Sequence, residues 1–315
     1  MGNKRIIRVL SGFGLAAIVF VIIGLIQDNA SLFETKDNTV TEQDIQRVKS
    51  FELPDSLYFA GERVPLENFD TRESLDRELN SNAYFHSSTL LLIKRSHRYF
   101  PVIEPILEEN GIPDDFKYLA VAESNLSNVI SPAGATGFWQ FMNSTAKEFG
   151  LELNDQVDER YHLEKSTGAA CRFFMKSYEK YGNWTMVAAS YNRGSNGVDK
   201  LINIQEEDNY YNLLLPDETS RYLFRILAFK TIFNNPEKYG FEIPEKHLYP
   251  PLEYTTVIID STVNSFAEFA LSHGTNYKIF KAFNPWLRQP YLNISPGKSY
   301  EIKIPVKGTR TKAYK

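Results

Sequence analysis

The longest uncharged stretch of the chain lies near its N-terminus. Residues 9–26 are uncharged and largely apolar, and three basic residues, Lys4, Arg5 and Arg8, precede them. In a helix these residues would span about 27 Å, close to the hydrocarbon thickness of a bilayer. No Ala-x-Ala cleavage site follows, as it would in a cleaved signal peptide. The pattern predicts an uncleaved signal anchor over residues 1–27, with a cleaved signal peptide or a buried helix as alternatives, and it places the rest of the chain outside the cytoplasm.

Two segments of different pattern follow. Residues 28–50 are polar, with short charged clusters, and residues 28–58 are predicted to form a linker. From residue 59 to residue 243 apolar residues recur at helical spacing, so this region is predicted to be a mostly α-helical domain. Its helices are expected over residues 90–110, as a pair interrupted near Pro101 and Pro105, and over residues 114–123, 164–181, 184–192 and 220–234.

The pattern changes after a proline-rich boundary at residues 244–251. A β-branched run over residues 254–260 and an alternating run over residues 299–305 predict two strands, with two short helices between them. Residues 252–306 should therefore form a small βααβ domain. The basic residues 307–315 should form a disordered tail.

Composition and charge exclude several classes of function. The 315-residue chain has a formal net charge of −4, but both ends are basic, so about −12 remains on the middle. An acidic body argues against a nucleic-acid-binding protein. The only cysteine, Cys171, excludes a disulfide framework or a Cys-ligated zinc site within one chain, and its place near an apolar stripe predicts a buried, slowly reacting thiol. The five histidines include no pair at helical metal-ligand spacing.

One glutamate stands where an apolar residue would be expected. Phe116, Leu119 and Ala120 precede Glu123 at spacings that put all four side chains on one helix face. Desolvation on such a face should raise the pKa of the carboxyl group. A glutamic acid that holds its proton near neutral pH is what general-acid cleavage of a glycosidic bond requires. The alternatives are a residue at the helix end that turns into solvent, or a buried carboxyl group satisfied by Ser124 and backbone.

Two further segments support a sugar-cleaving site. Gly134 and Gly137 allow a tight turn before Phe138-Trp139-Gln140, which would supply aromatic faces and an amide donor of the kind that sugar subsites use. Tyr191 and Asn192 follow on a later helix, where a phenol could orient a carboxyl group. Taken singly, aromatic residues at helical spacing are more often part of the core.

Together, in this order and spacing, the three segments resemble the family 1 lytic murein transglycosylases, whose catalytic domain is of the SLT, goose-lysozyme-like type. Within the family, the membrane-bound type D enzymes are the most similar group. The resemblance is detailed over residues 111–198 and looser over residues 87–241. It rests on three motifs, Glu123-Ser124, Gly137-Phe138-Trp139-Gln140 and Ser190-Tyr191-Asn192. The chain departs from the usual pattern at Phe138, Ser190 and Arg193, and none of these changes removes a chemical group that the family uses.

The resemblance implies cleavage of the β-1,4 bond between N-acetylmuramic acid and N-acetylglucosamine in peptidoglycan. Glu123 would protonate the leaving oxygen and then act as a base on the muramyl 6-hydroxyl, which closes a 1,6-anhydro ring. Tyr191 would position Glu123. The residues expected to bind sugar or support the loop are Ser124, Gly137, Phe138, Trp139, Gln140 and Asn192. No metal or organic cofactor is implied.

This scheme needs one carboxyl group, whereas ordinary glycosidases use two that flank the bond. Asp155 and Asp158 are the candidates for a second carboxylate, and neither belongs to a recognisable pairing motif. Two alternatives stay open: a hydrolytic muramidase of the same fold, and a non-catalytic scaffold that binds peptidoglycan.

The βααβ unit resembles a LysM module, a common peptidoglycan-binding partner of this family. The similarity covers residues 254–305 and includes Phe283-Asn284-Pro285, which resembles the Asn-Pro that ends a helix in such modules. The usual Gly-Asp-Thr-Leu opening is replaced by Asp260-Ser261-Thr262-Val263, so retained sugar binding stays open. The family would place the protein on the periplasmic side of the inner membrane of a bacterial envelope. Its partners would be glycan strands and the membrane, without nucleic acid.

Overall fold

The computed structural model describes residues 48–310. Contacts divide the chain after residue 50, and the elements below all belong to the second unit, Phe51–Lys315. The expected signal anchor over residues 1–27 lies outside the described residues, as do most of the expected linker and the end of the basic tail. Among the helices of the described region, none combines the length and the apolar character that a membrane span requires.

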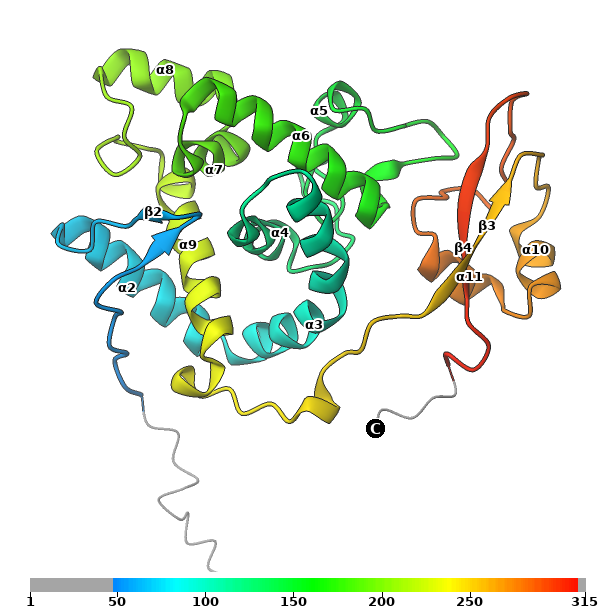
Figure 1. The fold of residues 1–315 in the computed structure, drawn as a ribbon, viewed down its shortest axis with the longest axis horizontal. Helices are drawn as coiled ribbons and strands as arrows, with labels where there is room; N and C mark the ends of the chain where they lie inside the picture. Colours follow the sequence, from blue (N-terminus) through cyan, green and yellow to red (C-terminus); the bar gives the residue numbers. More distant parts are fainter. Residues whose placement is uncertain (1–47, 311–315) are drawn as a thin grey trace, which may run out of the picture. The chain divides into compact units, whose positions relative to one another are not determined.

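A mostly α-helical domain fills the first part of the second unit, as the sequence predicted (Figure 1). Its elements are β1 (Tyr58–Phe59), β2 (Glu62–Arg63), α2 (Phe69–Tyr84), α3 (His86–Glu109), η1 (Asp114–Phe116), α4 (Lys117–Ser124), α5 (Asn143–Glu148), η2 (Glu159–Tyr161), α6 (Leu163–Tyr181), α7 (Trp184–Arg193), α8 (Ser195–Gln205) and α9 (Asp217–Asn234). Helices α2, α5 and α8 and the β1–β2 hairpin have no counterpart among the predicted elements. In α2 the buried face includes Thr71 and Glu78, so its apolar periodicity is weak.

The helical domain begins earlier than residue 59. Leu57 and Phe59 are buried, and Phe51 and Leu53 pack against a buried cluster that contains Leu79. The last residues of the expected linker therefore belong to the domain.

Helix α3 runs without a break through Pro101 and Pro105, where the sequence analysis wrongly expected an interruption. A proline inside a helix removes a hydrogen bond and clashes with the carbonyl group four residues earlier. The helix nevertheless keeps one buried face along its length, formed by Thr89, Leu92, Ile93, Ser96, Phe100, Ile103 and Leu107. Burial of this continuous face offsets the local cost of the prolines, which the linear pattern does not reveal.

Local signals fix the ends of the helices that surround α4. Asn183 caps α7, because its side chain accepts a hydrogen bond from the Met186 N–H at 2.8 Å. Gly182 ends α6 in the left-handed conformation, with φ 71°. The Glu62 carboxylate in β2 also accepts the Trp184 N–H at 2.5 Å, so the hairpin is bonded to the start of α7.

Helix α4 lies in the interior of the helical domain, where α3 and α9 pack against it (Figure 1). Its residues 118–121 are almost fully buried. Helix α9 also packs against α2 and α7. The C-terminal end of α4 is therefore within reach of side chains from α7 and α9.

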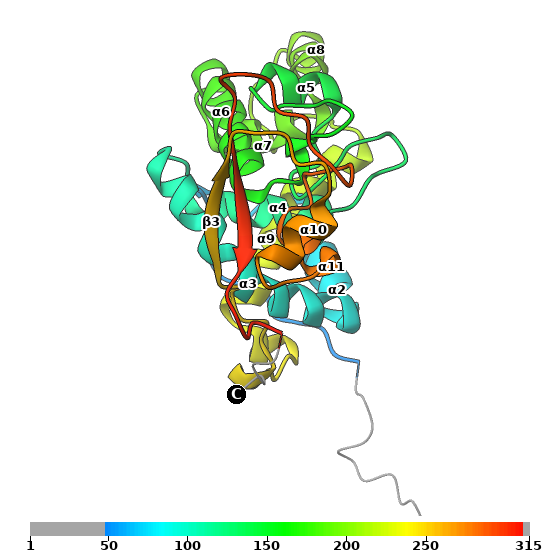
Figure 2. The ribbon, with the colours of Figure 1, turned by 90° about the vertical axis from the view of Figure 1, so that its right-hand side faces the viewer.

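The C-terminal domain has the expected βααβ order. It consists of β3 (Tyr254–Ile259), α10 (Phe266–Ser272), α11 (Tyr277–Phe283) and β4 (Tyr300–Pro305). The strands lie side by side and pair antiparallel, with Tyr254 opposite Pro305 and Ile259 opposite Tyr300 (Figure 2). The buried Asn284 donates to the Lys303 carbonyl at 2.7 Å and accepts the Lys303 N–H at 2.9 Å. This asparagine therefore bonds the end of α11 to β4.

Candidate active site

The C-terminal end of α4 places Glu123 and Ser124 beside an unusual stretch of backbone. Asn125 and Leu126 both adopt positive φ, at 55° and 50°, and Gln140 does so at 49°. Non-glycine residues rarely take this conformation, and those that do cluster at functional sites. Among the described residues, one of the five such positions is the predicted site residue Gln140, and two others directly follow the predicted Glu123-Ser124 pair.

The Glu123 carboxyl group has the raised pKa that its spacing predicted. Its Oε1 accepts a hydrogen bond from the Tyr222 hydroxyl at 2.6 Å. Burial raises the pKa of Glu123 from 4.5 to about 7, the Tyr222 hydrogen bond opposes this rise, and the charges of Glu218 and Arg225 act in opposite directions. The residue keeps partial exposure. Glu123 is thus neither a solvated helix-end residue nor a carboxyl group paired with Ser124, and it can hold a proton near neutral pH.

Tyr222 is the contact of Glu123 that the sequence analysis missed. It lies on α9, is 2 % exposed, and its pKa is raised well above the ordinary value by burial and by the Glu123 charge. In the sequence it is one more aromatic residue on the buried stripe of an amphipathic helix. No local signal distinguishes it from a core residue, so only the packing of α9 on α4 reveals its role.

Tyr191 lies close to Glu123 but donates its hydrogen bond elsewhere. Its hydroxyl donates to the Trp139 carbonyl at 2.5 Å. Burial raises the pKa of Tyr191 well above its ordinary value, and the Glu123 charge adds to this effect. The phenol therefore holds the loop that contains Trp139 against α7, while Tyr222 bonds to the carboxyl group.

The Gly134–Phe141 loop is closed on itself. The Thr136 N–H donates to the Phe141 carbonyl at 3.1 Å, and the Gln140 side-chain amide donates to the carbonyls of Gly137 at 2.8 Å and Val129 at 3.1 Å. Gly137 has φ 84°, and a Cβ atom there would lie 2.0 Å from the Arg160 carbonyl oxygen. Only glycine fits at this position, and the Gln140 amide supports the loop.

Phe138 and Trp139 do not offer aromatic faces to a sugar, contrary to the expectation. They are 3 % and 0 % exposed. The Trp139 indole N–H donates to the Thr167 hydroxyl at 2.9 Å, and the Phe138 ring packs edge-on against Tyr99. The two rings fasten the loop to the core because the turn at Gly137 directs them inward.

The remaining predicted residues support the site from behind. The buried Ser124 hydroxyl donates to the Ala120 carbonyl at 3.1 Å. The Asn192 side-chain oxygen accepts a hydrogen bond from the Thr219 hydroxyl at 2.9 Å, which connects α7 to α9. This bond holds together the two helices that carry Tyr191 and Tyr222.

The candidates for a second carboxylate have other contacts. Asp158 forms an ion pair with Arg160 at 2.7 Å. Asp155 is exposed, and its backbone carbonyl, not its carboxylate, accepts a hydrogen bond from Gln289 at 3.1 Å. Within residues 48–310, no cluster of His, Cys, Asp and Glu could hold a metal ion. Cys171 is fully buried, as predicted, and burial raises the pKa of its thiol to about 12.

Two cavities of about 140 Å³ and 1160 Å³ open between the helical and C-terminal domains. Both are lined by residues of the two domains, and Glu123 lines neither of them. The Glu123 carboxyl group is therefore surrounded by α4, α7 and α9, and it does not face either cavity.

Comparison with known proteins agrees with this architecture. Residues 101–214 match the family model of the transglycosylase SLT domain, and residues 255–308 match that of the soluble lytic transglycosylase C-terminal LysM-like domain. The first match lies within the helical domain, and the second covers the βααβ domain, which is called the LysM-like domain below. The chain is 28% identical over 267 residues to "Membrane-bound lytic murein transglycosylase D" of Escherichia coli strain K12, and to the protein of the same name from Escherichia coli O6:H1. Each alignment covers 79% of this chain and 55% of the relative, so the chain spans about half the length of these curated relatives.

Proposed function

We propose that the protein is a lytic transglycosylase that cleaves the β-1,4 bond between N-acetylmuramic acid and N-acetylglucosamine in peptidoglycan. The observation that carries the proposal is the Glu123 carboxyl group, whose pKa is raised to about 7 by burial and which accepts the Tyr222 hydrogen bond. The SLT-domain match and the names of the relatives supply the substrate class.

A single carboxyl group performs both proton transfers in this scheme. Protonated Glu123 donates its proton to the bridging oxygen as the bond to the anomeric carbon breaks. The resulting carboxylate keeps its hydrogen bond from Tyr222, which stabilises the charged form. Glu123 then removes the proton of the muramyl 6-hydroxyl as its oxygen attacks the anomeric carbon. The ring closes as a 1,6-anhydro product, Glu123 regains its proton, and no water is consumed.

The supporting residues keep this carboxyl group in place. Tyr191 holds the Gly134–Phe141 loop through the Trp139 carbonyl, and Asn192 connects α7 to α9. Both contacts fix the elements around Glu123, and neither requires a metal or an organic cofactor.

The first test removes the acid. Glu123→Gln keeps the size and the hydrogen-bond acceptor but cannot donate a proton, so release of soluble fragments from purified peptidoglycan should fall about 100-fold or more. Glu109→Gln, an exposed position at the end of α3, is the matched control and should retain activity. Equal rates for the native protein and Glu123→Gln would instead favour a non-catalytic scaffold.

We also propose that residues 1–27 anchor the protein in the inner membrane, with its body on the periplasmic side and the LysM-like domain on glycan strands. The uncharged run over residues 9–26 and the membrane-bound relatives support this. The full chain should sediment with membranes, and a chain lacking residues 1–27 should remain in the supernatant with activity. Supernatant recovery of the full chain would contradict the anchor.

A further inference from the structure

One loop connects the candidate active site to the LysM-like domain. It follows α5, and residues 152–164, which we call the bridge segment, comprise the end of this loop and the first two residues of α6 and contact both sides. The bridge segment belongs to the helical domain in sequence, yet part of it is buried in the core of the LysM-like domain.

Backbone groups of the bridge segment bond to the LysM-like domain directly. The Asp158 N–H donates to the Trp286 carbonyl at 2.9 Å, and the Arg288 N–H donates to the Gln156 carbonyl at 2.8 Å. Between these bonds, residues 157 and 287 form an antiparallel β-bridge. These backbone bonds resemble those between paired strands, and they fix the position and direction of the bridge segment relative to the LysM-like domain.

Apolar side chains bury the same contact. Val157 is 1 % exposed and Tyr161 is 6 % exposed, and both belong to the buried cluster that contains Trp286 and Leu287. The Arg288 guanidinium lies 4.0 Å from the centre of the Tyr161 ring. The LysM-like domain therefore shares its core with the bridge segment.

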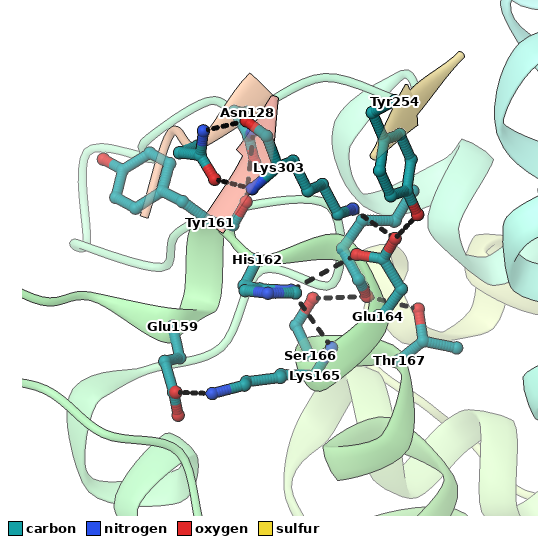
Figure 3. A network of polar contacts seen from close by, with 12 residues as sticks. Asn128, Glu159, Tyr161, His162, Glu164, Lys165, Ser166, Thr167, Tyr254 and Lys303 are labelled. Carbon is teal, nitrogen blue, oxygen red and sulfur yellow. Dashed lines mark hydrogen bonds and ion pairs between the residues drawn. The ribbon is translucent and has the colours of Figure 1, made fainter. Parts of the chain in front are cut away.

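Polar groups close the edge of this contact (Figure 3). Glu164 forms an ion pair with Lys303 of β4, accepts the Tyr254 hydroxyl at 3.3 Å, and lies 3.2 Å from the His162 ring nitrogen. Burial alone would raise the pKa of Glu164, but the contacts with His162 and Lys303 outweigh it and hold this pKa well below its usual range. The carboxylate therefore stays charged, and it connects the two domains.

The other side of the bridge segment holds the loop of the active site. The guanidinium of Arg160 donates to the carbonyls of Gly134 and Phe141, both at 3.2 Å, so it joins the two ends of the loop. Its own backbone carbonyl is the atom that excludes any side chain at Gly137. Asp158, whose N–H is bonded to the LysM-like domain, orients this guanidinium through an ion pair at 2.7 Å.

We propose that the LysM-like domain is a structural part of the active site, because it holds the bridge segment whose Asp158 and Arg160 position the Gly134–Phe141 loop. The inference rests on the proposed function. A module that only anchors the enzyme to the wall would increase activity on insoluble walls and leave the turnover of soluble strands unchanged. A module that positions the loop affects kcat on both substrates.

The test separates the domains within the full chain. Leu287→Asp places a charge in the buried contact with Val157, so kcat on soluble, uncross-linked glycan strands should fall about 10- to 100-fold, as expected when the Gly134–Phe141 loop is displaced. Hydrogen exchange at the Gly137 and Gln140 amides should become faster. The control, Leu271→Asp, makes the same substitution at a position on α10 that is 69% exposed. It should leave both kcat on soluble strands and amide exchange unchanged.

A second set of variants, which reverse charges at the domain boundary, keeps the test decisive if Leu287→Asp unfolds the LysM-like domain. Glu164→Lys and Lys303→Glu each place like charges across the boundary and should give the same two changes to a smaller extent. The double variant restores an ion pair and should recover kcat and slow exchange.

Native kcat on soluble strands and native amide exchange in Leu287→Asp and in both single charge variants would overturn the inference. Loss of activity on insoluble walls alone would then assign the domain to anchoring. Hydrogen exchange needs no substrate, so it tests the contact between the domains independently of activity. A failure of the proposed function would instead appear as equal release of fragments by the native protein and Glu123→Gln.

Discussion

At the scale of single residues, two opposing effects dominate the pKa of the Glu123 carboxyl group. Burial on the apolar face of α4 favours the neutral form of Glu123, and the Tyr222 hydrogen bond favours the charged form. The balance leaves the pKa of Glu123 at about 7, where the group can both donate and accept a proton.

Tyr222→Phe should shift this balance in one direction, toward the neutral form of Glu123. Loss of the hydrogen bond raises the pKa of Glu123, so the alkaline limb of the kcat/KM profile should move to higher pH. The carboxylate formed during cleavage also loses a stabilising contact, so kcat should fall about 10- to 100-fold. Tyr210→Phe is the matched control, because this buried hydroxyl donates only to backbone carbonyls of Thr219 and Ser220. A shift of the limb to lower pH in Tyr222→Phe would contradict the assignment.

The same pKa makes a prediction about stability. A carboxyl group with a raised native pKa binds its proton more tightly in the folded state, so stability is lost as pH rises from about 4.5 through about 7. Glu123→Gln cannot ionise and should be more stable than the native protein at pH 9 by about 1–3 kcal/mol, with little difference at pH 4.5. Denaturant unfolding at both pH values measures this. The same difference at both would mean that Glu123 is solvated.

Residue spacing predicted part of this site. Glu123 was identifiable because a charged residue on an apolar helix face stands out. Phe138 and Trp139 were assigned to sugar binding because sequence cannot tell which way a ring turns after Gly137. Tyr222 was missed because its partner is 99 residues away in the chain.

At the scale of elements, contacts distant in sequence hold the helices around Glu123. The Glu62 carboxylate accepts the N–H groups of Trp184 and Thr185 and bonds to the Thr185 hydroxyl, which satisfies donors at the start of α7. A negative charge there also interacts favourably with the helix dipole. The periodic pattern found α4, α6, α7 and α9, but it missed α2, whose buried face contains polar residues.

Glu62→Gln should therefore destabilise the helical domain. The amide accepts fewer hydrogen bonds and carries no charge, so the free energy of unfolding should fall by about 1–2 kcal/mol. Glu67→Gln, an exposed member of an ion pair with Arg63, is the control and should change it little. Thermal or denaturant unfolding measures the free energy of unfolding of each variant. Equal effects of the two variants would show that the Glu62 contacts do not stabilise α7.

At the scale of the whole described molecule, domain order could be predicted and domain contact could not. The change from helical to alternating periodicity marked the boundary near residue 244. The bridge segment gave no such signal, because its contacts with the LysM-like domain join residues far apart in the chain, such as Gln156 with Asn293 and Glu152 with Tyr300. Asp158 was considered as a second carboxylate, yet its ion pair with Arg160 gives it a positioning role between the two domains.

The most direct test of the account is the chemistry of the cleaved ends. Purified protein is incubated with peptidoglycan, and the soluble products are analysed by mass spectrometry beside a Glu123→Gln digest. The account predicts muramyl ends lighter than a reducing sugar by the mass of one water, as an anhydro ring requires, and their absence with Glu123→Gln. Reducing muramyl ends that incorporate oxygen from labelled water would contradict it and identify the protein as a hydrolytic muramidase.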